Sequence, residues 1–113
     1  MDLDIRQTGT TCTLKLKGAF KTVSVRDFDA AVESAISGGH IYLILDMEAM
    51  PVIDSSGIGA VVNALRRTKQ FGGNTMLVNP SPFAAKTFKM VGILSLFDVF
   101  ASEEEAIAAC AAG

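Results

Sequence analysis

The sequence predicts an α/β fold, a small mixed β-sheet covered by about four α-helices in the order β-β-α-β-α-β-α-β-α. Short apolar runs alternate with segments whose apolar residues recur every three or four positions, which is the spacing of one helix face. Half of the residues are hydrophobic and few are aromatic, which suits an aliphatic core between helices and a sheet. Strands joined through helices should lie parallel, whereas the first two, joined by a short turn, should pair antiparallel.

Length and charge narrow the class of protein. The 113 residues suffice for one domain, which we expect to span residues 1–113. The formal net charge of −2 and the lack of a basic run argue against nucleic acid and an anionic membrane surface as partners. The first residues lack the features of a signal peptide, and no stretch approaches the ~18 apolar residues of a membrane span. We therefore expect a soluble protein of the cytoplasm.

Residues that commonly bind metals or catalyse reactions are scarce. Cys12 and Cys110 lie far apart in apolar surroundings and are interpreted as small core residues, although the sequence alone leaves a disulfide open. The only histidine, His40, follows a glycine pair, where a solvated loop residue is the usual case. Because metal-ligand spacings and phosphate-binding loops are absent from the sequence, we expect neither a metal nor a cofactor.

The chain begins with a predicted hairpin. Residues 3–7 fit an edge strand, and residues 11–17 alternate as a half-buried strand does, with Cys12, Leu14 and Leu16 on the apolar face. Gly18 ends the second strand.

A first helix is predicted after residues 18–23. Ser24 and Asp27 have the spacing of a capping box in which Asp replaces the usual Glu. The pair Gly38-Gly39 ends this helix. Its apolar stripe consists of Phe28, Val32, Ala35 and Ile36.

A second unit of strand and helix follows. Residues 41–45 are too apolar for anything but a buried strand, and Pro51 makes a helix through the next loop improbable. Apolar residues recur at helical spacing from Ile58 onward, so a helix should begin close to Ser56 and run to about Phe71.

The start of this helix is unusual in composition. Either Asp54 or Ser55 can cap its free N–H groups. Gly57 and Gly59 fall in its first turns, although glycine costs about 1 kcal/mol against alanine inside a helix. Two glycines there indicate that another backbone, or another molecule, comes close.

The last third of the chain predicts a third and a fourth helix. Residues 75–78 form a short strand, and Ser81 and Pro82 form a favourable helix start. Residues 96–100 resemble a strand, and Ser102-x-x-Glu105 is a capping box that opens an alanine-rich helix. The apolar side of the third helix is predicted to consist of Phe83, Thr87, Met90 and Val91, and Gly92 ends it.

The segment Asp54-Ser55-Ser56-Gly57-Ile58-Gly59 has a structural and a functional interpretation. In the structural one, it is only a capped helix start packed tightly on the sheet. In the functional one, the Ser55 hydroxyl is presented at the helix mouth. Following a buried strand and a Pro-containing loop, this segment resembles the signature of the STAS domain, and more narrowly of the bacterial anti-sigma factor antagonists. The resemblance covers nearly the whole chain in length and order of elements.

This resemblance implies a regulator that switches partners. In the family, an anti-sigma factor with serine kinase activity phosphorylates the serine that directly follows the Asp, which is Ser55 here; Ser56 is the second choice. The unmodified antagonist binds the anti-sigma factor and releases the sigma factor, and a phosphatase resets the modified form. The expected partner-binding residues are Asp54, Ser56, Gly57, Ile58, Gly59, Phe20 and Lys21.

One position departs from the family pattern. The turn after the second strand commonly carries an acidic residue shortly after its glycine, beside the serine. Here Gly18 is followed by Ala19, Phe20 and Lys21. A cation in this turn changes which partner surface would fit, and it could also pair with a phosphate on Ser55.

Self-contained catalysis is improbable. A nucleophilic serine needs a base within hydrogen-bond reach, and the segment is not a G-x-S-x-G elbow because Asp54 and Ser56 stand where glycine is wanted. We therefore expect no catalytic residue and no enzyme activity. The alternative function is a non-phosphorylated STAS interaction subunit of a transporter or multiprotein signalling complex, in which the serine is only a helix cap.

Overall fold

The computed structural model describes residues 1–112, and its elements follow the predicted order with one added turn of 3₁₀ helix, η1. The strands are β1 (Asp2–Thr8), β2 (Thr11–Lys17), β3 (Tyr42–Asp46), β4 (Asn74–Val78) and β5 (Val99–Phe100). The helices are α1 (Thr22–Ser37), α2 (Ser55–Gln70), α3 (Pro82–Met90), η1 (Leu94–Leu96) and α4 (Glu103–Ala112). The mixed sheet and its helical cover confirm the predicted fold class.

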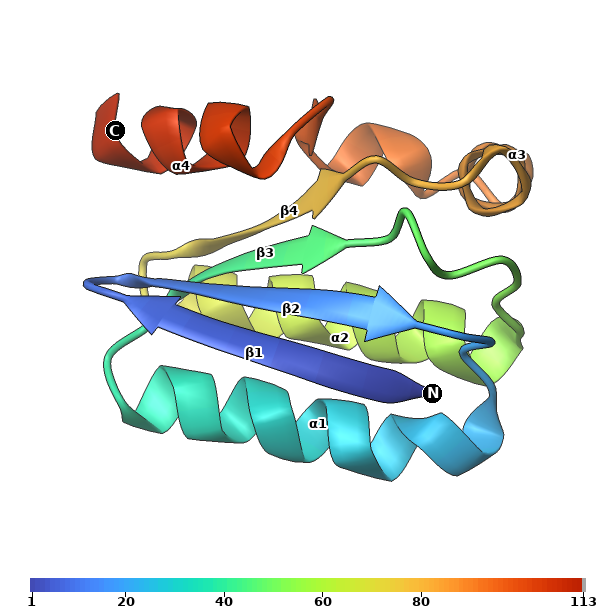
Figure 1. Ribbon diagram of the computed structural model, residues 1–113, viewed down its shortest axis with the longest axis horizontal. Coiled ribbons are helices and arrows are strands. Elements are labelled where there is room, and N and C mark those ends of the chain that lie inside the picture. The colour runs from blue at the N-terminus through green and yellow to red at the C-terminus, as the bar shows by residue number, and fades with distance from the viewer. Residues whose placement is uncertain (113) are drawn as a thin grey trace.

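The five strands form one sheet in the order β1-β2-β3-β4-β5. β1 pairs antiparallel with β2, and the remaining neighbours are parallel, as the connections through helices require. Helices α1 and α2 cover one face, α4 covers the other, and α3 lies beyond the end at which β3 and β4 finish (Figure 1). The two edges differ, because β1 is long and β5 has two residues.

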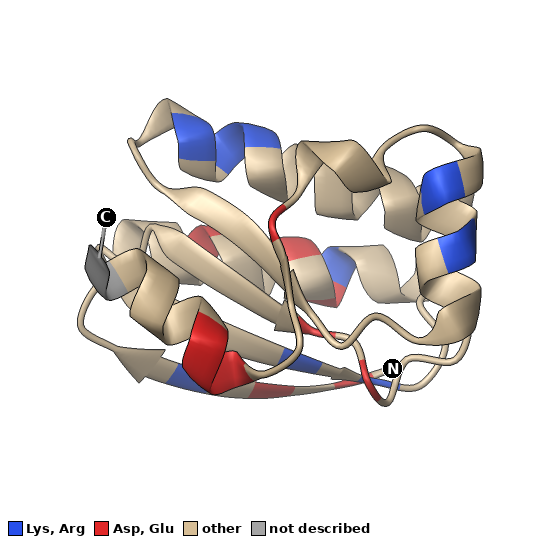
Figure 2. Cartoon of the chain, turned by 90° about the horizontal axis from the view of Figure 1, so that it is seen from above, with Lys and Arg blue, Asp and Glu red and all other residues tan. Residues whose placement is uncertain are grey.

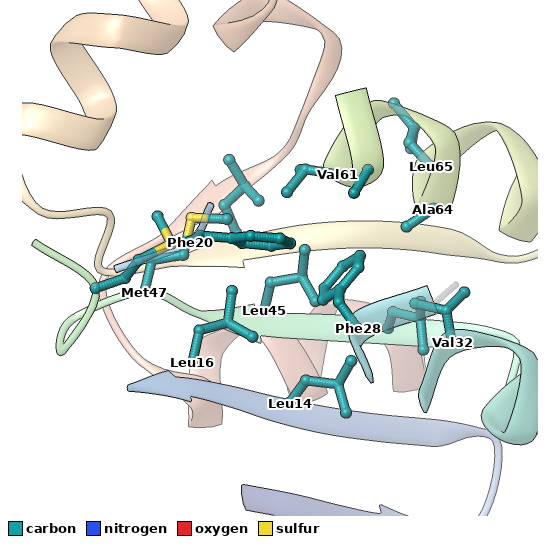
Figure 3. Close-up of a cluster of buried hydrophobic side chains, with 14 of the residues drawn as sticks. Leu14, Leu16, Phe20, Phe28, Val32, Leu45, Met47, Val61, Ala64 and Leu65 are labelled. Atoms are coloured by element: carbon teal, nitrogen blue, oxygen red, sulfur yellow. The ribbon is translucent and has the colours of Figure 1, made fainter. Parts of the chain in front are cut away.

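The larger core lies between the sheet and the α1–α2 layer (Figure 3). It includes Leu14 and Leu16 of β2 and Phe28 of α1, so the predicted faces of these two elements are confirmed. The ring of Phe28 packs against that of Phe20, with the centroids 5.0 Å apart and the rings tilted by 55°. Phe20 lies in the connection before α1, and its ring anchors that connection in the core.

The predicted capping box at the start of α1 is wrong. The helix begins at Thr22, so Ser24 already lies inside its first turn, where the residue is buried. Its hydroxyl donates to the Ala19 carbonyl at 3.5 Å instead of capping. Lys21 occupies the N-cap position and makes no side-chain cap. The start of α1 must therefore be satisfied by a group from elsewhere in the chain.

The predicted apolar side of α3 is also wrong. The helix packs on the core through Ala84 and Phe88. Phe83, Met90 and Val91 instead remain 51%, 76% and 54% exposed. The helix start is as predicted, since the Ser81 Oγ accepts from the N–H of Ala84 at 3.2 Å and Pro82 occupies the first turn.

The structure of the last predicted strand and helix agrees only in part with the prediction from the sequence. Of the strand expected over residues 96–100, only Val99–Phe100 pairs with β4, because the chain first makes the 3₁₀ turn η1. The fourth helix starts as predicted, with the Ser102 Oγ accepting from the N–H of Glu105 at 3.2 Å. No helix within residues 1–112 is long and apolar enough to cross a membrane.

The two cysteines are free thiols on different faces of the sheet. Cys12 is buried in the larger core, and burial raises the pKa of its thiol. Cys110 packs with the smaller cluster under α4, and its Sγ donates to the Met76 Sδ at 3.6 Å. His40 is half-buried, and its Nδ1 lies 2.6 Å from the Gly9 carbonyl oxygen, which places the ring against the turn between β1 and β2.

Candidate functional site

Two loops lie side by side at the end of the sheet where β2 and β3 finish. Phe20, before α1, forms a parallel bridge with Ile53, before α2. The Phe20 N–H donates to the Val52 carbonyl at 2.9 Å, and its carbonyl accepts from the N–H of Asp54 at 3.0 Å. These bonds bring the first turns of α1 and α2 together. The positive ends of two helix dipoles therefore meet at this place.

Asp54 joins the two helix starts. Its Oδ1 accepts a hydrogen bond from the N–H of Gly57 at 3.0 Å, which caps α2. Its Oδ2 accepts from the N–H of Thr22 at 3.2 Å, which satisfies the first residue of α1. Of the two caps predicted for α2, Asp54 is the one that forms. The same carboxylate supplies the cap that α1 lacks in its own sequence.

Ser55 is the first residue of α2, and it is exposed. Within residues 1–112, no group forms a side-chain hydrogen bond with its hydroxyl. Ser56, the second choice, is half-buried, and its Oγ lies 2.9 Å from the Oγ1 of Thr22. The two hydroxyls thus differ in access, since one faces solvent and the other links α2 to α1.

Gly57 lies where the two loops come closest. A Cβ at this position would lie 2.7 Å from the Cγ1 of Ile53 and 2.9 Å from the carbonyl oxygen of Phe20. The expected close approach of another backbone is therefore real at Gly57. At Gly59, by contrast, a Cβ would meet nothing within 4 Å. Gly59 is exposed one turn after Ser55, on the same side of the helix.

The other residues predicted at a partner surface have different positions. Lys21 is exposed, and it lies between Phe20 and Thr22, both of which bond to Asp54. Ile58 is half-buried and packs against the core. Phe20 has no exposed surface, so the expectation that it faces a partner is wrong. Its part is to hold the loop in place.

The side chains that could activate a serine have other hydrogen bonds or lie elsewhere in the fold. Both oxygens of Asp54 accept backbone hydrogen bonds, which hold the carboxylate at the starts of α1 and α2. His40 is bonded to the turn between β1 and β2, at the opposite end of β2 from Ser55. Within residues 1–112, no three His, Cys, Asp or Glu side chains come together as a metal site would require. The geometry instead presents one hydroxyl to solvent.

Sequence reasoning missed Thr22. This residue uses its N–H for Asp54 and its hydroxyl for Ser56, so it contacts two members of the predicted segment. Nothing local marks it, because both partners lie more than thirty positions away and become neighbours only through the Phe20–Ile53 bridge.

Comparison with known proteins places this geometry in a family. Residues 2–106 match the family model described as the STAS domain. The anti-sigma F factor antagonist of Lysinibacillus sphaericus is 34% identical over 101 residues, which cover 88% of this chain and 86% of that protein.

Solved structures of an anti-sigma factor antagonist are also similar to this chain. The anti-sigma factor antagonist SpoIIAA in its unphosphorylated form superposes with a TM-score of 0.87 at 30% identity, covering 99% of this chain and 98% of that one. The phosphorylated form of SpoIIAA from Bacillus superposes with a TM-score of 0.77 at 30% identity, covering 96% and 98%.

Proposed function

The chain belongs to the STAS domain family, and from this we propose that it is an anti-sigma factor antagonist switched by phosphorylation of Ser55. The observation that carries the proposal is the exposed hydroxyl of Ser55 at the start of α2. A kinase can reach this hydroxyl without unfolding the helix. Ser56 is the weaker candidate, because its hydroxyl is already engaged with Thr22. Relatives that bear the antagonist name, from Lysinibacillus sphaericus and among the solved structures, support the same function.

The partner in this proposal is an anti-sigma factor with serine kinase activity. In its unmodified form the protein binds this factor and so releases a sigma factor. Ser55, Gly59 and the half-buried Ile58 would lie at the contact, with the small glycine leaving room for the kinase to approach the hydroxyl. The protein acts as substrate and ligand, and we expect no turnover of its own.

Phosphorylation would change the charge of the contact. A phosphoserine carries about −1.5 to −2 charges. In the free protein the phosphate would lie beside two helix N-termini, which favour an anion. At an interface that already holds the Asp54 carboxylate, it would meet repulsion and loss of solvent, each of which weakens binding. Moving a partner from 99% bound to 99% free requires a difference in binding free energy of about 5.5 kcal/mol. Like charges placed together at an interface cost several kcal/mol, so one phosphate has an effect of the required size.

The test uses the anti-sigma F factor of Lysinibacillus sphaericus as the kinase, since that organism holds a close relative of this chain. The wild-type protein is incubated with the factor and ATP, and intact mass spectrometry follows the addition of phosphate. We expect one phosphate on the wild type and on Ser56→Ala, and none on Ser55→Ala. Full phosphorylation of Ser55→Ala would refute the assignment.

A binding measurement completes the test. Calorimetry with the factor and ADP should give similar affinities for the wild type and Ser55→Ala, and a much weaker one for Ser55→Asp. If all three proteins bind the factor equally, and the incubation with ATP adds no phosphate to the wild type, a non-phosphorylated interaction subunit is favoured instead.

A further inference from the structure

Strand β1 leaves one edge of the sheet open. It is the first strand in the sheet order, and within residues 1–112 its one strand neighbour is β2. All of its residues except Leu3 are exposed, and Figure 1 shows the strand in front of the rest of the sheet. A long exposed edge strand presents N–H and C=O groups in the geometry that pairs with a further strand. The other edge offers much less, because β5 has two residues.

The turn between β1 and β2 decides which residues of β1 offer these groups. A two-residue loop joins Thr8 to Thr11, and the pair that flanks such a loop is hydrogen-bonded. Hydrogen-bonded and non-hydrogen-bonded pairs alternate along an antiparallel ladder. The even-numbered residues of β1 therefore bond to β2, whereas Leu3, Ile5 and Gln7 direct their N–H and C=O groups outward.

The side chains of β1 carry charges of both signs on one face of the strand. Arg6 lies on the face that α4 covers, since it pairs with Glu103 of that helix at 3.2 Å. Asp4 lies on the same face and pairs with Lys17 of β2 at 2.5 Å. Figure 2 shows acidic and basic residues along this outermost strand, beside the acidic first turn of α4. The opposite face carries Ile5, which is 54% exposed.

We propose that β1 pairs antiparallel with β1 of a second copy of this chain, with Ile5 on the twofold axis. In this register the two Ile5 residues form a hydrogen-bonded pair, and Leu3 pairs with the partner's Gln7. Each copy places its Asp4 opposite the partner's Arg6, so the contact contains two ion pairs. The contact is isologous and occupies both β1 edges, so it closes as a dimer.

Charge selects this register over its neighbours. Because outward-facing residues must pair, the strands can slide only by steps of two residues. One step places Asp4 opposite Asp4 although it pairs Asp2 with Arg6, and a step the other way places Arg6 opposite Arg6. Both steps put like charges together on the twofold axis. In the proposed register the charges alternate across the contact, in the order Glu103, Arg6, the partner's Asp4 and the partner's Lys17.

Sedimentation equilibrium of the wild-type protein tests whether the dimer forms. A contact through one strand is smaller than a standard interface, so we expect a dissociation constant on the order of 100 µM. The mean mass should therefore rise from that of one chain toward that of two between about 10 µM and 1 mM. A protein that stays monomeric over this range, or that grows beyond a dimer, would overturn the proposal.

Charge variants test the register. Arg6→Asp and Asp4→Arg each place like charges at both ion-pair positions, and each should weaken its own dimer at least tenfold. An equimolar mixture of these two variants should associate again, because both contacts between them then join opposite charges. The matched control is Asp2→Arg, which changes the net charge as Asp4→Arg does but lies opposite Thr8, and it should dimerise as the wild type does.

The mixture also separates pairing from folding, since a variant that fails to fold cannot regain a partner; circular dichroism checks each variant alone. If Asp2→Arg weakens the dimer as much as Asp4→Arg, the proposed register is wrong. If the mixture stays monomeric while the wild type dimerises, the copies associate elsewhere than along β1. None of these results bears on the proposed function, because Ser55 lies on α2.

Discussion

The Oδ2 of Asp54 accepts a hydrogen bond from the backbone N–H of Thr22, 3.2 Å away and 32 positions earlier in the chain. The Oδ1 of the same side chain accepts from Gly57 at 3.0 Å. One carboxylate therefore satisfies the starts of two helices, and the exposed Ser55 follows it directly. The residue that positions the candidate hydroxyl is also a structural link between α1 and α2.

Replacing Asp54 should destabilise the fold by an amount that depends on how many of its two helix caps are lost. An N-cap contributes typically about 1 kcal/mol. Asp54→Ala removes two caps and should lower the free energy of unfolding by about 2 kcal/mol, whereas Asp54→Asn keeps one acceptor oxygen and should lower it by about 1 kcal/mol. Urea denaturation followed by circular dichroism measures both.

The control for this prediction is Ser102→Ala, which removes a single cap at the start of α4. Its cost should match that of Asp54→Asn rather than that of Asp54→Ala. An Asp54→Ala protein no less stable than Ser102→Ala would contradict the double role of the carboxylate.

The two glycines of the segment should respond oppositely to alanine. Gly57→Ala places a methyl group 2.9 Å from the Phe20 carbonyl oxygen, a backbone atom that cannot move cheaply. We expect a loss of about 1–3 kcal/mol. Gly59→Ala meets nothing and should stabilise the protein by up to about 1 kcal/mol, since alanine favours helix. Chemical denaturation of the two variants is the measurement, and equal effects would contradict the packing at Gly57.

The helix starts show where sequence reasoning succeeded and where it could not. The sequence predicts Ser81 as the cap of α3 and Asp54 as one of two possible caps of α2. Both predictions are possible because each residue directly precedes the helix that it caps. The prediction of Ser24 as the cap of α1 is wrong, because the group that caps this helix comes from a loop that only folding brings near. A local pattern carries no information about such a partner.

The α3 helix shows a second limit. Its apolar residues occupy more than one side, so periodicity alone could not decide which side packs. The structure buries Ala84 and Phe88 and leaves Met90 76% exposed. Where a sequence holds more apolar residues than its core uses, the surplus is a candidate for contact with another molecule.

Thr68 and Thr75 form a buried hydroxyl pair between α2 and β4, with the two Oγ1 atoms 2.9 Å apart and both residues fully buried. Thr68→Val leaves the Thr75 hydroxyl without this partner and should cost about 1–3 kcal/mol. Thr75→Val should cost less, because the Thr68 hydroxyl also lies 3.0 Å from the carbonyls of Ala64 and Leu65. The double variant should lose less than the sum, and a strictly additive cycle in urea denaturation would argue against the pair.

The pair of Asp4 and Lys17 gives a pH prediction. A hydrogen bond from Lys17, and then its charge, hold the pKa of the Asp4 carboxyl below its ordinary value. Because the folded pKa is depressed, this contribution to stability is present above the ordinary pKa of Asp and is lost as the pH falls through the folded value. NMR titration of Lys17→Met should show the pKa of Asp4 rising toward its ordinary value. Lys15→Met should raise the pKa of Asp4 less, because the charge of Lys15 contributes least to lowering it. Equal shifts in the two variants would contradict the pairing of Asp4 with Lys17.

Lys21 should bind a phosphate placed on Ser55. It is exposed, and both of its chain neighbours bond to Asp54, the residue before Ser55. A nearby cation favours the doubly charged form of a phosphate and lowers its second pKa, which is about 6 in phosphoserine. With phosphoserine incorporated at position 55 during translation, ³¹P NMR titration should therefore give a higher pKa in Lys21→Ala than with Lys21 present, and a higher one still in Lys21→Glu. Lys15→Ala, on the exposed side of β2, should leave the titration unchanged. A phosphate that titrates identically in all four proteins would show that the cation in this turn faces away from the modified serine and acts, if at all, on the partner.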